Sequence, residues 1–96
     1  MYDKNNIFSK IIKDEIPCEK VYEDEDVLFF NDINPISKIH VLGVPKLFCR
    51  DFSDFVSIAQ PEALASFFKK TDMVIDRLGI RETGYKILTN SGKDGG

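Results

Sequence analysis

Residues 20–30 read Lys-Val-Tyr-Glu-Asp-Glu-Asp-Val-Leu-Phe-Phe, two β-rich runs on either side of an acidic quartet. The runs Lys20–Tyr22 and Val27–Phe30 contain β-branched and aromatic residues, which favour strands. The quartet between them could in principle hold a cation, but metal-binding loops usually space their oxygens and include a turn-making glycine. We therefore interpret Glu23–Asp26 as the solvated turn of a β-hairpin.

Further elements are predicted on the C-terminal side of this hairpin. Ile39–Val44 is a third strand with apolar residues on both faces, which indicates a sheet covered on both sides at that point. Residues Phe52–Ile58 predict one or two helical turns. A long helix is expected over 61–78, with a proline at its first position and Gly79 as its C-terminal cap. Tyr85–Asn90 then predicts a fourth strand.

On the N-terminal side, apolar residues at helical spacing predict a short amphipathic helix that ends before Ile16-Pro17. The order is therefore a short helix, three strands, a long helix and one strand. Short connections between successive strands are typical of an antiparallel sheet. The sequence predicts a small antiparallel α+β fold in which residues 1–96 form a single domain.

Composition excludes several classes of protein. Hydrophobic residues make up 43% and charged residues 30% of the chain, as in ordinary globular domains. A net charge of −3 argues against a nucleic-acid or anionic-membrane partner. Val27–Phe30, the longest unbroken apolar run, is too short to span a bilayer, and the N-terminus has no secretory h-region. Cys18 and Cys49 lack zinc spacing, so we expect a cytoplasmic protein with reduced thiols.

The candidate chemical groups have ordinary structural explanations as well. His40 is the only histidine, and a lone histidine beside apolar strand residues is more often structural than catalytic. Asp32 and Asn34 precede or flank Pro35, where they could contact a sugar or a metal, or simply form the turn. Neither cysteine has a base beside it in the sequence, so a thiol nucleophile is disfavoured.

The glycine-rich stretch Ser91–Gly96 is also ambiguous. A Walker-type phosphate loop needs Gly-Lys-Ser/Thr running into a helix, and no helix follows here. Backbone amides around Gly92 and Gly95 could form an anion-binding nest. Read alone, the stretch is better explained as a chain end.

Several stretches taken together resemble the histidine triad (HIT) family, in its protein-kinase-C-interacting or purine-nucleoside-binding branch. They cover nearly the whole chain: residues 7–12 (IFSKII), 15–17 (EIP), 21–24 (VYED), 32–35 (DINP), 40–46 (HVLGVPK), 84–85 (GY) and 90–96 (NSGKDGG). The resemblance implies an antiparallel α+β fold that dimerises through the long helix and the strand after it.

The resemblance also implies a function. It indicates a purine nucleotide pocket for an AMP-like ligand and hydrolysis of a nucleoside phosphoramidate or acyl-nucleotide, or nucleotidyl transfer, through a nucleotidyl-histidine. The Asp32 carboxylate would accept hydrogen bonds from the ribose hydroxyls, and Asn90 with the glycine-rich loop would approach the α-phosphate. His40, Gly95 and Gly96 would support the site. The positions that match nucleotide-binding residues of the family are Phe8, Ile11, Phe30, Asn31, Asp32, Ile33 and Asn90.

The sequence departs from the family pattern in its chemistry. The His-x-His-x-His motif, whose middle histidine attacks phosphorus, is absent from these 96 residues, and His40 matches a different position. We therefore assign no catalytic residue and expect the chain to be inactive. We further expect it to be incomplete at its C-terminus and to lack the last strand of the sheet. A non-catalytic dimeric interaction or nucleotide-binding module is the alternative.

Three smaller departures concern single positions. Asn31 stands where relatives commonly have histidine, which would loosen a base contact. Phe48 also stands where histidine is frequent. The zinc-binding Cys-x-x-Cys of some members would fall at Asn6 and Ser9, so no metal site and no cofactor are expected.

Overall fold

The computed structural model describes residues 18–32 and 38–95 of the chain. The chain divides after Phe48 into two compact units, Tyr2–Phe48 and Cys49–Gly96, and each is described by itself. The predicted short N-terminal helix lies outside the described residues. The first unit contains the sheet, and the second contains the helices and the glycine-rich loop.

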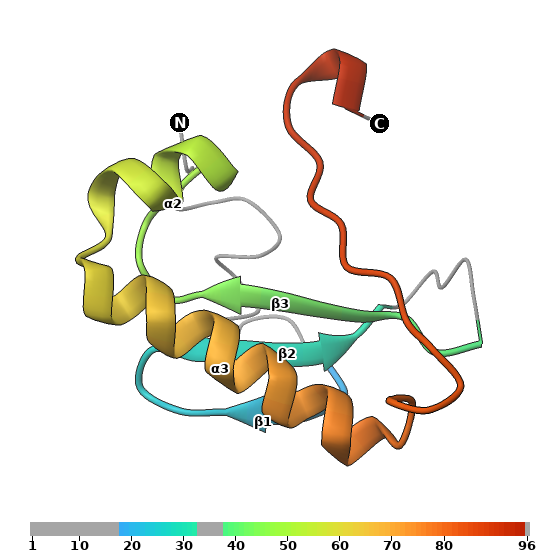
Figure 1. The fold of residues 1–96 in the computed structure, drawn as a ribbon. Helices are drawn as coiled ribbons and strands as arrows, with labels where there is room; N and C mark the ends of the chain where they lie inside the picture. Colours follow the sequence, from blue (N-terminus) through green and yellow to red (C-terminus); the bar gives the residue numbers. More distant parts are fainter. Residues whose placement is uncertain (1–17, 33–37, 96) are drawn as a thin grey trace. The chain divides into compact units, whose positions relative to one another are not determined.

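Three strands form one antiparallel sheet in the order β1-β2-β3 (Figure 1). They are β1 (Lys20–Glu23), β2 (Val27–Asn31) and β3 (Val41–Pro45). Strand β2 is central, and its pairing with β3 runs without interruption from Val27 opposite Pro45 to Asn31 opposite Val41. The three strands predicted for this part of the chain, and the α+β class, are confirmed.

Three residues of the acidic quartet, Asp24–Asp26, form the predicted hairpin turn, whereas Glu23 is the last residue of β1. The side chain of Asp24 accepts hydrogen bonds at Oδ1 from the backbone N–H of Asp26 at 2.8 Å and of Val27 at 3.0 Å. The N–H of Asp24 donates to the carbonyl of Val27 at 3.0 Å. A short carboxylate can bond the backbone just ahead of it, so an acidic residue here stabilises a turn.

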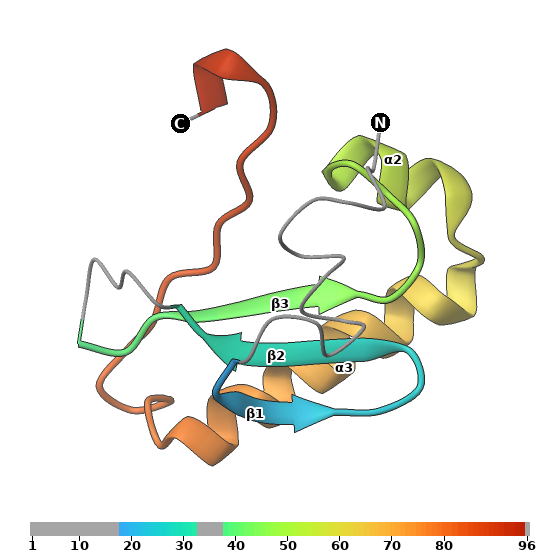
Figure 2. The same cartoon turned by 180° about the vertical axis from the view of Figure 1, so that it is seen from behind.

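The core of the first unit is centred on β2, the strand that lies between β1 and β3 (Figure 2). Val27, Leu28, Phe29 and Phe30 are each at most 3% exposed. Because side chains alternate along a strand, four consecutive buried residues mean that both faces of β2 are covered. Leu28 and Phe30 share one face with the partly buried side chains of Cys18, Leu42 and Val44.

On the other face, the ring of Phe29 lies over Gly43, its partner across the ladder. A Cβ atom at Gly43 would lie 2.5 Å from Cε1 of Phe29 and 2.8 Å from Cδ1. The buried ring has little room to move, since Phe29 is only 3% exposed. The glycine is therefore required by close packing.

We predict that Gly43→Ala lowers the free energy of unfolding by about 1–3 kcal/mol through overpacking. Gly95→Ala is the matched control, because its Cβ would meet no atom closer than 3.7 Å. Denaturant unfolding of both variants checks this. A Gly43→Ala protein as stable as the parent would contradict the account of the Phe29 contact.

The second unit begins with two helices. Helix α2 (Phe52–Ile58) is followed after a short break by α3 (Pro61–Leu78), both as predicted. Pro61 occupies the first turn of α3, and Gly79 ends it with φ 69°, a left-handed conformation that glycine adopts without strain. The Phe55 and Phe67 rings meet edge to face with centroids 5.2 Å apart, which joins the two helices.

The predicted fourth strand is wrong for this structure. Residues Tyr85–Asn90 follow α3 as an exposed segment that joins no ladder of the described sheet (Figure 1). Tyr85, Ile87 and Leu88 are 47%, 60% and 59% exposed. These residue types favour strands, but a strand also needs a neighbouring strand to bond its backbone N–H and C=O groups. Propensity alone therefore does not make this segment a strand.

Candidate functional site

Polar side chains gather at one end of the sheet, where β2 ends and β3 begins. Asn31 is the last residue of β2 and Asp32 follows it, while His40 immediately precedes β3. The backbone N–H of Asp32 donates to the carbonyl of His40 at 2.9 Å, which extends the ladder by one step. The sheet register thus brings these three predicted site residues together.

Within this group, a carboxylate faces an imidazole. Nδ1 of His40 lies 3.5 Å from Oδ2 of Asp32, and the two side chains are 26% and 21% exposed. The separation is long for a hydrogen bond but short enough for an electrostatic attraction when His40 is protonated. Because both groups are partly shielded yet reachable, Asp32 can accept hydrogen bonds from a small ligand.

Glu19 belongs to the same end of the sheet, although it was not among the predicted site residues. Its carbonyl accepts from the N–H of Asn31 at 2.9 Å, and its Oε1 accepts from Nδ2 of Asn31 at 2.8 Å. A carboxylate only accepts, so this bond fixes which side of the Asn31 amide is the NH₂ group. The sequence carried no local sign of this contact, because the pairing of β1 with β2 creates it.

The other predicted nucleotide-binding residues divide into two groups. Phe30 is 2% exposed and packs with Leu28, so its side chain belongs to the core beneath the polar group. Phe8, Ile11 and Ile33 lie outside the described residues.

The glycine-rich loop belongs to the second unit. Asn90 is exposed, Gly92 has φ 68°, and Lys93–Gly95 forms a single 3₁₀ turn. The N–H of Gly95 donates to the carbonyl of Gly92 at 3.2 Å. That amide is already engaged within the turn, which removes one donor from the anion nest considered above. Gly96 lies outside the described residues.

Neither cysteine has the environment of a nucleophile. Cys49 is buried, and burial raises the pKa of its thiol, with the charges of Asp54 and Asp51 adding to the effect. A raised pKa keeps the thiol neutral, whereas the thiolate is the reactive form. Cys18 packs against the core of the first unit. The structure thus agrees with the sequence argument against thiol catalysis.

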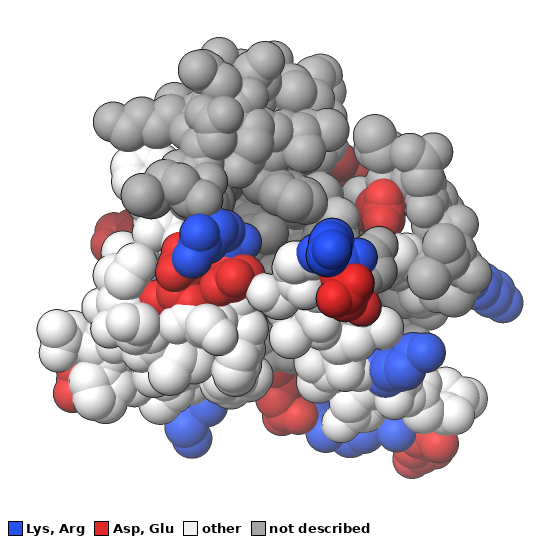
Figure 3. Space-filling view, turned by 90° about the horizontal axis from the view of Figure 1, so that it is seen from above, with Lys and Arg blue, Asp and Glu red and all other residues white. Residues whose placement is uncertain are grey.

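At the other end of the sheet, Glu23 joins strands β1 and β3. Its carboxylate lies 2.7 Å from Nζ of Lys20 and 2.7 Å from Nζ of Lys46. The hydrogen bond from Lys20 and then that from Lys46 lower the pKa of Glu23. Lys46, the last residue of the HVLGVPK stretch, is therefore engaged in holding the sheet. On the face drawn in Figure 3, acidic and basic side chains lie next to one another in several places.

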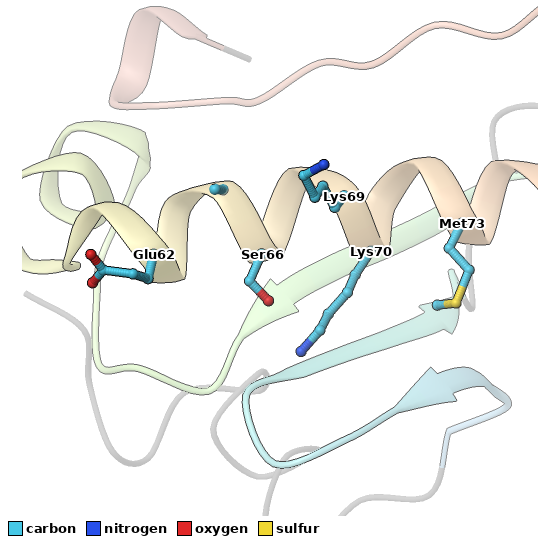
Figure 4. A pocket seen from close by; sticks show the side chains of 6 residues that line it. Glu62, Ser66, Lys69, Lys70 and Met73 are labelled. Carbon is cyan, nitrogen blue, oxygen red and sulfur yellow. The ribbon is translucent and has the colours of Figure 1, made fainter.

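An open hollow of about 520 Å³ runs along α3 (Figure 4). Its lining comes from that helix alone: Glu62, Ala65, Ser66, Lys69, Lys70 and Met73. It contains none of the predicted nucleotide-binding residues. A surface built by one helix offers few convergent polar groups, so we do not identify this hollow with the site.

Two further properties concern the described residues as a whole. In the ranges 18–32 and 38–95, no group of three or more His, Cys, Asp or Glu side chains is arranged to hold a metal ion. Neither α2 nor α3 has the length and hydropathy needed to cross a bilayer.

The described residues thus form a small antiparallel α+β fold with Asn31, Asp32 and His40 at one end of its sheet. Comparison with known proteins identifies the family to which this fold belongs. The model of the HIT domain matches residues 13–96, so the chain belongs to the HIT domain family.

Individual relatives agree with this assignment. A HIT-like protein of Helicobacter pylori is 46% identical over 91 residues, which cover 95% of this chain and 84% of the relative. The purine nucleoside phosphoramidase of Escherichia coli is 36% identical over 93 residues, covering 97% and 77%. The solved HIT family hydrolase of Legionella pneumophila superposes with a TM-score of 0.85 at 32% identity, covering 96% and 81%.

Proposed function

We propose that this chain binds a purine nucleotide and that the Asp32 carboxylate holds the ribose. The observation that carries the proposal is the position of Asp32, partly shielded at the end of β2 and flanked by Asn31 and His40. Membership of the HIT family and the Escherichia coli relative, named a purine nucleoside phosphoramidase, support the choice of ligand.

The chemistry of the group suits a ribose. A carboxylate has two oxygens that only accept, so it can bond both hydroxyls of a cis-diol. The imidazole of His40 beside it offsets part of the negative charge when protonated. Ile33, Phe8 and Ile11 are proposed as apolar contacts of the nucleoside. The side chain of Phe30 is buried in the core, so we propose that it supports these contacts from within the sheet. Asn90 is proposed to contact the α-phosphate, with His40, Gly95 and Gly96 as residues that support the site.

Calorimetric titration tests this proposal. We expect AMP to bind with measurable heat, and more tightly than UMP, because a purine presents a larger apolar face than a pyrimidine. Equal affinity for both nucleotides would overturn the purine assignment. Absence of binding to either at millimolar concentration would overturn the nucleotide-binding proposal itself.

We also propose that these 96 residues carry out no nucleotidyl-histidine step. Phosphoramidate or acyl-nucleotide hydrolysis and nucleotidyl transfer are the reactions that the resemblance to the HIT family implies. The sequence has one histidine, His40, and its Nδ1 atom lies 3.5 Å from the Asp32 carboxylate. With a fluorogenic adenosine phosphoramidate we expect no turnover above the blank. Turnover above the blank would contradict the proposal.

The second candidate function that we propose is a non-catalytic homodimeric module of the cytoplasm. Exposed apolar side chains favour it: Phe68 on α3 is 50% exposed, and Tyr85, Ile87 and Leu88 follow in the same unit. Exposed apolar side chains that form one patch often mark an interface between proteins. Light scattering during gel filtration distinguishes a dimer of about twice 11.0 kDa from a monomer.

A further inference from the structure

The glycine-rich loop is joined to a residue far away in the sequence. Oγ of Ser91 donates a hydrogen bond to Oδ2 of Asp51 at 2.9 Å, across 40 positions of the chain. Both residues belong to the unit Cys49–Gly96. The contact therefore links the start of α2 with the start of the loop within one compact unit.

The carboxylate that receives this bond is itself fixed by the helix. Asp51 is the N-cap of α2, and its Oδ1 accepts from the backbone N–H of Asp54 at 2.9 Å. The carboxylate of Asp54 in turn accepts from the N–H of Arg50 at 3.0 Å. Each oxygen of Asp51 thus has its own role, since Oδ1 caps the helix while Oδ2 bonds Ser91. A carboxylate held by a helix cap is a rigid anchor for a surface loop.

The described part of the loop has only weak local support besides this anchor. Residues 90–95 are all exposed, and the backbone bond that joins Gly95 to Gly92 is 3.2 Å long and local to the turn. Glycine gains more conformational freedom than other residues when it is released. A loop with Gly92 and Gly95 in it therefore depends strongly on the contacts that tie it down.

We propose that Asp51 is a positioning residue which, through Ser91, holds the glycine-rich loop in one conformation and so places Asn90 and the loop amides for an anionic group. The identity of that group as a nucleotide phosphate rests on the function proposed above. The ordering of the loop does not. A loop ordered before the ligand arrives loses less conformational entropy on binding, which raises affinity.

The protonation of Asp51 gives the anchor a defined pH dependence. The hydrogen bond from the Asp54 N–H, then that from Ser91, lowers the pKa of Asp51 below its ordinary value of 3.8, and Arg50 adds to the effect. The carboxylate of Asp54 and the thiol of Cys49 are further titratable groups beside it, and the charge of the N-terminal amine also lowers its pKa. Because the pKa of Asp51 is lower in the folded state, its ionised carboxylate contributes its full stabilisation of the folded state above pH 3.8. This contribution is lost as the pH falls through the lowered folded-state pKa of Asp51.

Backbone ¹⁵N relaxation of the protein without ligand tests the anchor directly. Ser91→Ala removes the donor and leaves the cap of α2 intact. Asp51→Ser keeps a good N-cap residue, but the serine side chain is too short to reach Ser91. Thr89→Ala is the matched control, since it removes a hydroxyl from the same exposed segment. For Gly92 and Gly95 we expect order parameters to fall from about 0.85 to below about 0.6 in the first two variants only.

A second measurement connects the loop to ligand binding. We expect Ser91→Ala and Asp51→Ser each to weaken AMP binding by about 3- to 10-fold, and the double variant to be no weaker than either. Their thermal midpoints should match that of Thr89→Ala, because the Asp51–Ser91 bond is exposed.

The outcomes separate the two proposals. Loop order parameters that are unchanged in Ser91→Ala and Asp51→Ser, or already below about 0.6 in the parent, would overturn the anchor. Normal AMP affinity in both variants despite a mobile loop would overturn the positioning role. If the loop loosens as expected but neither parent nor variant binds AMP, the anchor stands and the nucleotide-binding proposal fails.

Discussion

Leu28→Ala is expected to lower the free energy of unfolding by about 2–5 kcal/mol, the range for large-to-small changes in a packed core. Leu28 is fully buried at 0% exposure on the central strand and packs with Phe30, Leu42 and Val44. Its removal leaves a cavity that neighbours on β2 and β3 can fill only in part. Typical domains have a margin of about 5–15 kcal/mol, so a large share of the stability should be lost.

Val56→Ala is the control for this experiment. Val56 lies on α2 and is 46% exposed, so its truncation should change stability by no more than about 0.5 kcal/mol. Urea unfolding followed by circular dichroism gives both values. A loss below about 1 kcal/mol for Leu28→Ala would mean that the core is not centred on β2.

Asp32→Asn is expected to weaken AMP binding by about 10- to 100-fold, because hydrogen bonds to a charged acceptor are each worth about 1.5–3 kcal/mol. The substitution keeps the shape of the side chain and replaces one acceptor oxygen by a donor, which cannot bond a ribose hydroxyl hydrogen. Fold stability should change little, since the backbone bond from Asp32 to His40 remains.

Glu25→Gln provides the matched control for Asp32→Asn. Glu25 is exposed in the hairpin turn, and its change removes the same single negative charge from the chain. Calorimetry should show unaltered AMP affinity for this variant. If both variants bind AMP as tightly as the parent does, Asp32 does not hold the ribose. If both variants weaken AMP binding equally, the effect comes from the change in net charge.

Much of the fold could be predicted because local patterns and long-range packing agree. The acidic turn at Asp24, the two runs beside it, and Gly79 after a long amphipathic helix each point to the element that forms. The segment 85–90 was wrongly predicted because its residues favour a strand, while pairing depends on a neighbour that local sequence does not reveal.

The site was predictable to the extent that it depends on sequence motifs. The resemblance pointed to Asn31, Asp32 and His40, and the sheet register brings them together. Glu19 and Asp51 could not be found in this way. Glu19 reaches Asn31 across 12 positions and Asp51 reaches Ser91 across 40, so both contacts exist only after the chain has folded.

The location of the ligand is tested most directly by ¹H–¹⁵N spectra recorded as AMP is added to the protein. We predict that the largest shifts fall on the amides of Asn31, Asp32 and His40, at the end of the sheet where the carboxylate and imidazole meet. These shifts should titrate together and give one dissociation constant. Shifts confined to the hollow along α3, lined by Ser66, Lys70 and neighbouring residues, or no shifts at millimolar AMP, would contradict the proposed site.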